Sequence, residues 1–94
     1  MSIKERALAL IEIKGASPRQ LEELTGIDRY RWQNLKNKEP QKATEEHLEA
    51  LAKLWPEYAY WLITGKTLPA VGQIAPERVT ELKMVAEDKE KYTV

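Results

Sequence analysis

The sequence contains no cysteine, so neither disulfide bonds nor cysteine-ligated zinc can form. It has one histidine, His47, which cannot build a metal site alone, and we expect no metal or other cofactor. No apolar run approaches the roughly 20 residues that a membrane-spanning helix needs, and the N-terminus lacks the pattern of a signal peptide. These absences argue against a membrane or secreted protein, so a cytoplasmic location is expected.

Features of known enzymes are also missing. The chain has no cysteine nucleophile, no glycine-rich phosphate loop and no HExxH metal-binding motif. The paired acids Glu22-Glu23 and Glu45-Glu46 are expected on helix surfaces, where runs of charge usually contact only solvent. We therefore expect a protein that is not an enzyme.

What is present suits one small domain with a tail. The chain has 94 residues, of which 43% are hydrophobic, and a core of this size is close to marginal, so oligomerisation would help it. The net charge is zero but unevenly distributed. Residues 14–42 carry seven basic and four acidic side chains, a net charge of +3, whereas residues 43–94 carry −3. A surface that binds nucleic acid is therefore expected in the first of these segments.

Apolar residues recur at helical spacing, and no segment alternates polar and apolar residues as a strand would. Ile3, Ala7, Leu10 and Ile11 form one such stripe. The predicted fold class is all-α, with five helices. Helix starts are expected after the caps Ser17, Asp28 and Thr44 and at Pro56, and helix ends at the glycines Gly15, Gly26 and Gly65.

The expected core draws on every helix. Leu21 and Leu24 are expected to face inward, Trp32 and Leu35 to be buried, and Trp55 and Trp61 to fill a core that lacks phenylalanine. His47 is expected on a helix surface.

The C-terminal part differs in composition. Residues 66–75 contain Pro69 and Gly72 and are predicted to be a linker. Residues 76–92 are predicted to form a charged sixth helix that packs on the body, associates with a partner or frays. The expected division is a domain over 1–68, followed by a linker and C-terminal helical extension over 69–94.

Residues 17–37 predict two short helices joined by a tight turn at Gly26. At about 100° per residue, the second of these helices has Trp32 and Leu35 on one side and a polar face on the other. An arginine suits the two acceptors of guanine, and amide side chains suit adenine. The candidate base-contacting residues are Arg29, Tyr30, Gln33 and Asn34.

Basic and polar residues also flank this polar face. They are suited to contact phosphates, as are the N-terminal amides of the first of the two helices. The alternative is an ordinary solvated polar surface. The candidate phosphate-contacting residues are Arg19, Lys36, Asn37 and Lys38.

Three motifs resemble the lambda-repressor-like (XRE, Cro/C1-type) family of helix-turn-helix proteins. They are Leu21-x-x-Leu24-Thr25-Gly26-Ile27, Trp32-x-Asn34-Leu35-x-Asn37 and Tyr60-Trp61-Leu62-Ile63-Thr64-Gly65. The resemblance covers about residues 3–66. It implies a five-helix DNA-binding domain whose partner is double-stranded DNA. Two positions depart from the family pattern: Glu22 replaces a small alanine, and Pro18 replaces a glutamine that contacts the DNA backbone.

The expected function is sequence-specific regulation of transcription, most simply repression by occluding a promoter. One recognition helix reads only a few base pairs, so a homodimer on a palindromic operator is expected. Control would come from a regulatory protein partner, from the level of synthesis or from proteolysis. Two alternatives remain open: an antitoxin whose C-terminal segment wraps a toxin, and a protein-interaction module that has lost DNA binding.

Overall fold

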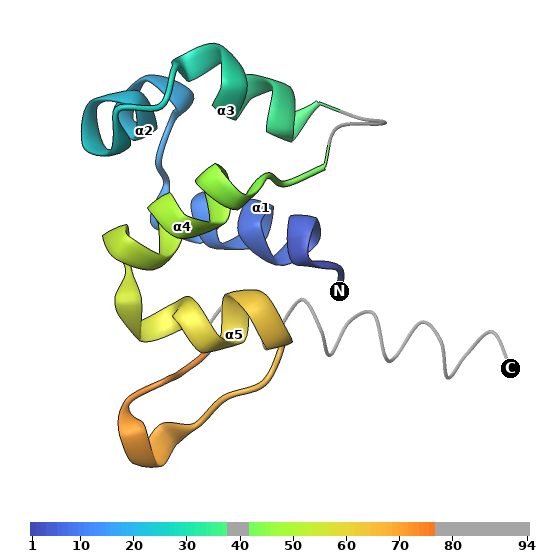
Figure 1. Ribbon diagram of the computed structural model, residues 1–94, viewed down its shortest axis with the longest axis vertical. Coiled ribbons are helices and arrows are strands. Elements are labelled where there is room, and N and C mark those ends of the chain that lie inside the picture. The colour runs from blue at the N-terminus through green and yellow to red at the C-terminus, as the bar shows by residue number, and fades with distance from the viewer. Residues whose placement is uncertain (38–41, 77–94) are drawn as a thin grey trace, which may run out of the picture.

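The computed structural model describes residues 1–37 and 42–76, and helices dominate both segments (Figure 1). Within these segments the sole β pairing is one isolated bridge between Leu68 and Gln73. The all-α expectation is therefore confirmed. The helices are α1 (Ile3–Lys14), α2 (Pro18–Thr25), α3 (Arg29–Lys36), α4 (Glu45–Leu54) and α5 (Ala59–Thr64), with 3-10 helices η1 (Pro56–Tyr58) and η2 (Pro69–Val71).

The predicted helix boundaries are confirmed by their caps. The Ser17 hydroxyl accepts from the Gln20 backbone N at 3.2 Å, and the Gln20 side chain accepts from the Ser17 backbone N at 2.9 Å. Asp28 accepts from the Tyr30 backbone N at 2.9 Å at the start of α3. Gly26 ends α2 with φ +77°, a left-handed conformation that costs glycine little. The predicted fifth helix over 56–64 divides into η1 and α5.

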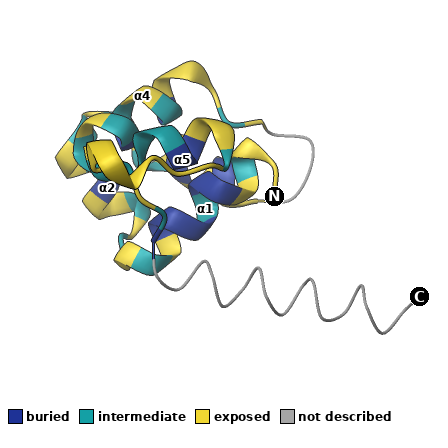
Figure 2. Ribbon diagram, turned by 90° about the horizontal axis from the view of Figure 1, so that it is seen from below, coloured by how far each residue is buried: buried dark blue, intermediate teal, exposed yellow. Residues whose placement is uncertain are grey.

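The helices are arranged around α1, which contacts both α3 and α5. In Figure 1, α2 and α3 lie at one end of the molecule and α5 lies toward the other. Five of the twelve residues of α1 are buried, and they appear as dark blue stretches of this helix in Figure 2. One apolar cluster joins these helices: Ala7, Ala9, Leu10, Ile11, Leu21, Trp32, Leu35, Leu51, Trp61 and Leu62.

The core differs from the expectation at two apolar positions. Leu24 was expected to face inward, but it is 59% exposed and lines a hollow beside α4. Trp55 is only half-buried, and it packs against the core cluster from outside. Trp61 is buried as expected, with 4% exposure.

The prediction for His47 was wrong. Its side chain is 2% exposed and lies against Trp32, with 4.8 Å between the ring centroids. Its Nδ1 accepts from the Thr44 backbone N at 3.2 Å and lies 2.9 Å from the Thr44 hydroxyl, so the histidine completes the capping box of α4. A histidine at the third helical position can serve as cap and core residue together.

The stretch predicted as a linker, residues 66–75, is attached to the body. Gln73 accepts from the Tyr60 backbone N at 2.9 Å and donates to the Pro56 carbonyl at 3.1 Å. The backbone N of Ile74 donates to the Glu57 carbonyl at 2.9 Å, and Pro76 is fully buried. This stretch is a turn that closes against η1 and α5. The predicted helix over 76–92 lies, apart from Pro76, outside the described residues.

A buried arginine connects α1 with α5. Arg6, in α1, is 8% exposed. Its Nε donates to the Leu62 carbonyl at 2.9 Å, and its Nη2 to the Ile63 carbonyl at 3.0 Å. These carbonyls belong to the last turn of α5, where a helix leaves acceptors without partners and favours a positive charge. Arg6 therefore caps α5 from α1.

No helix of the described part is long and apolar enough to span a bilayer.

Candidate nucleic-acid interface

The turn between α2 and α3 is held by Thr25. Its hydroxyl accepts from the backbone N of Ile27 at 3.2 Å and from the Trp32 indole Nε1 at 3.3 Å. Trp32 and Leu35 are fully buried, so one side of α3 is fixed against the body. The opposite side of α3 must then face solvent.

That outer side carries the four predicted base-contacting residues. Tyr30 is 66% exposed, and Gln33 and Asn34 are also exposed. Arg29 is half-buried at the N-terminal end of the same helix, which is the end that recognition helices present to bases. The structure brings the four together on one face, and their contact with bases stays a prediction.

Arg29 is engaged by Glu22 of α2, one of the two positions that depart from the family pattern. The two side chains form a salt bridge with 2.8 Å between Nη2 and Oε1. Hydrogen bonds from the Arg29 side chain and backbone N hold the pKa of the Glu22 carboxyl below its usual value. The same side-chain hydrogen bond to Glu22 raises the pKa of Arg29. Both groups are therefore charged at neutral pH.

The helices α2 and α3 with their turn form a two-helix unit, and the predicted phosphate-contacting residues lie at its two ends. Arg19 is exposed in the first turn of α2, and Lys36 and Asn37 are exposed where α3 ends. Lys38 lies outside the described residues. Lys4 of α1 adds a cation at the end of α3, because its Nζ donates to the Asn37 carbonyl at 3.4 Å. No sequence signal points to Lys4, which is 33 residues away from this partner.

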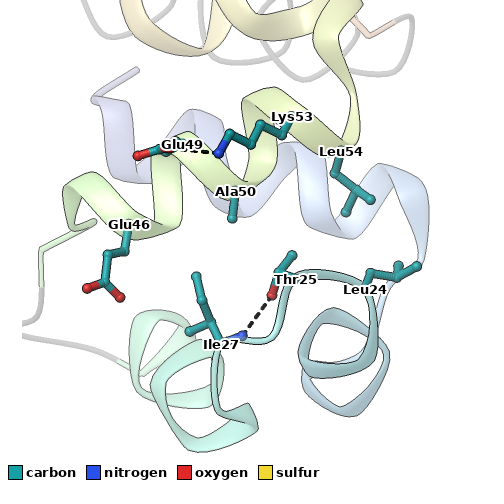
Figure 3. A pocket seen from close by; sticks show the side chains of 8 residues that line it. All are labelled: Leu24, Thr25, Ile27, Glu46, Glu49, Ala50, Lys53 and Leu54. Carbon is teal, nitrogen blue, oxygen red and sulfur yellow. Dashed lines mark hydrogen bonds and ion pairs between the residues drawn. The ribbon is translucent and has the colours of Figure 1, made fainter.

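Figure 3 shows a hollow of about 380 Å³ between α4 and the turn that joins α2 to α3. Leu24 lines it from the last turn of α2, Ile27 from the turn that follows, and Ala50 and Leu54 from α4. A Glu49–Lys53 ion pair of 2.9 Å lies at its edge. Among the described residues no group of histidine, cysteine, aspartate or glutamate is suited to hold a metal. The hollow is therefore a gap in the packing between the two-helix unit and α4.

A small all-α domain with an exposed two-helix unit at one end is the class that these features define. The solved structure of Pf6r, from the filamentous phage Pf6 of Pseudomonas aeruginosa PA01, is similar to this chain. The two share 36% sequence identity over 82% of this chain and 97% of the Pf6r chain, with a TM-score of 0.72. This chain belongs to the same family as Pf6r. Neither a model of a known protein family nor a curated protein matches the sequence.

Proposed function

We propose that this protein is a sequence-specific DNA-binding regulator of transcription, and that it belongs with Pf6r to the lambda-repressor-like (XRE) group. The observation that carries the proposal is the division of α3 into two sides. Trp32 and Leu35 fix the helix to the body, while Tyr30, Gln33 and Asn34 face solvent. A helix anchored in this way can enter the major groove with its polar side toward the base edges.

The distribution of charge supports the same orientation. Arg19 precedes the polar face, and Lys36 and Lys4 lie at its far end. Cations on both sides of a recognition helix can contact phosphates on both sides of the groove, which positions the helix without selecting sequence.

The simplest mode of action is repression. A homodimer would place two α3 helices in successive major grooves of a palindromic operator, and the bound protein would occlude the promoter. Because Pf6r comes from a filamentous phage, we propose that the regulated promoters are those of a phage or an integrated prophage.

Selection of bound sequences from a random pool of double-stranded DNA tests the proposal. The expected result is enrichment of one short motif, present as an inverted repeat if the protein binds as a dimer. Asn34→Ala should alter the enriched motif at one position of each half. A pool that shows no enrichment at low salt, from protein that is folded by circular dichroism, would refute DNA recognition.

A further inference from the structure

Both oxygens of the Glu22 carboxylate accept hydrogen bonds from Arg29. Oε2 accepts from the backbone N of Arg29 at 2.8 Å. Oε1 accepts from the Arg29 side chain twice, from Nε at 3.2 Å and from Nη2 at 2.8 Å. Asp28 already caps the start of α3 through the Tyr30 backbone N. Glu22 therefore holds the guanidinium of Arg29 by two hydrogen bonds that capping of α3 does not require, and these two bonds are called the grip of Glu22 below.

This grip leaves a defined part of the guanidinium unused. An arginine side chain has five N–H donors in a rigid plane. Glu22 takes one at Nε and one at Nη2, which lie along one edge of the fork. The Nη1 group and the second Nη2 hydrogen have no acceptor in the described segments, and the side chain is 42% exposed. The free donors lie side by side at the tip of the fork, the arrangement that the O6 and N7 acceptors of guanine require.

We propose that Glu22 is a positioning residue that determines base specificity, because it holds Arg29 ready to read one guanine. The proposal rests on the DNA binding proposed above. An arginine fixed before binding loses less side-chain freedom when it meets its base, and this favours the one geometry in which both acceptors are matched.

The carboxylate has a second effect on Arg29. A phosphate that approached the guanidinium would also approach the negative charge of Glu22. Arg29 is thereby discouraged from acting as a general phosphate contact, which would add affinity on every sequence. Glu22 thus lowers the affinity for DNA of any sequence and raises the discrimination at one base pair.

Four variants separate these effects. Glu22→Gln keeps the size of the side chain but removes the charge and one acceptor. Glu23→Gln is the matched control, because it removes the same charge from the adjacent exposed residue of α2, for which no ion pair or side-chain hydrogen bond is found in the described part. Arg29→Ala removes the reader, and the double variant Glu22→Gln/Arg29→Ala tests whether Glu22 acts through it. Each binds the selected operator, a series with one base pair replaced, and an unrelated duplex.

A good bidentate contact discriminates by about 5-fold to 150-fold. Glu22→Gln should lose most of this discrimination at the base pair read by Arg29, while Glu23→Gln keeps it. Glu22→Gln should also bind the unrelated duplex with a salt slope steeper by about one unit, since the freed arginine can reach a phosphate. In the Arg29→Ala background, Glu22→Gln should leave the discrimination at this base pair unchanged.

Discrimination that survives in Glu22→Gln overturns the inference, and tighter binding with unchanged preference would show that Glu22 only masks Arg29. If Glu22→Gln does not fold, Glu22→Ala replaces it, since alanine is the best helix former and creates no new contact. These outcomes are separate from a failure of the proposed function, in which the parent protein itself would show no sequence preference.

Discussion

Acidification from pH 7.5 to pH 5 should destabilise this protein, and His47 should be the main cause in that range. The imidazole is buried against Trp32, and its Nδ1 accepts the Thr44 backbone N–H. A proton on Nδ1 would place two donors against each other and break the cap of α4. The folded protein therefore disfavours the charged imidazolium.

The sign and size of the effect follow from proton linkage. Burial lowers the pKa of His47 below 6.5, and the charge of Arg31 lowers it further, while the backbone of Arg31 and the charge of Glu46 act in the opposite direction. The unfolded chain therefore binds the proton first, and stability falls as the pH drops below about 6.5. One proton gives a slope of up to about 1.4 kcal/mol per pH unit until the folded pKa is reached. This is a large part of the stability of a domain this small.

Urea unfolding at pH 7.5, 6.5 and 5.5 measures this slope directly. His47→Gln is the matched variant, because glutamine at the third helical position completes a capping box with Thr44 but does not titrate. The variant should be less stable at pH 7.5, since it loses the ring contact with Trp32, but its stability should not fall between pH 7.5 and pH 5.5. Carboxyl groups with lowered pKa values, such as that of Glu22, lose their contribution only below about pH 4.5. An equal slope in parent and variant would refute the reasoning.

Three further predictions concern Arg6, Trp32 and Lys36. Arg6→Met should lower the free energy of unfolding by about 2–4 kcal/mol, because charged hydrogen bonds to the carbonyls of α5 are lost; a urea midpoint equal to the parent's would contradict the cap. Trp32→Ala should cost about 3–5 kcal/mol and leave the domain largely unfolded, as measured by circular dichroism; a folded variant that no longer binds DNA would instead make Trp32 a contact residue. Lys36→Ala should reduce the salt slope of DNA binding by about one unit. Lys53→Ala, which removes the same charge from α4, should not, and equal effects of the two would place the DNA elsewhere.

Local chemistry made the helix boundaries predictable. Ser17 with Gln20, Asp28 with Tyr30 and Gly26 with Glu22 each act over two to four residues, so a short stretch of sequence contains both partners of each contact. The exposed side of α3 was predictable for the same reason, since helical spacing alone separates it from Trp32 and Leu35.

The contacts that spacing could not predict join distant segments. His47 is buried because α3 supplies Trp32 above it, and Gln73 fastens its turn because Tyr60 presents a free backbone N–H. Arginine is usually a surface residue, and Arg6 can be buried here only because α5 places two carbonyls beside it. The grip of Glu22 on Arg29 spans seven residues and a turn, and its geometry depends on how the two helices cross. Each of these contacts depends on how distant segments pack together, so it could be identified only from the tertiary structure.

The cap that Arg6 places on α5 also bears on how the protein is made. Its acceptors lie 56 and 57 residues further along the chain, so they emerge from the ribosome well after α1. Until then the guanidinium of Arg6 must stay hydrated, which keeps α1 from its final place in the core. The body should consequently fold only when α5 is available, as domains generally fold as units. A nascent chain that stopped within α4 would expose the apolar stripe of α1 to proteases, so unfinished copies of the protein would be cleared rather than accumulate.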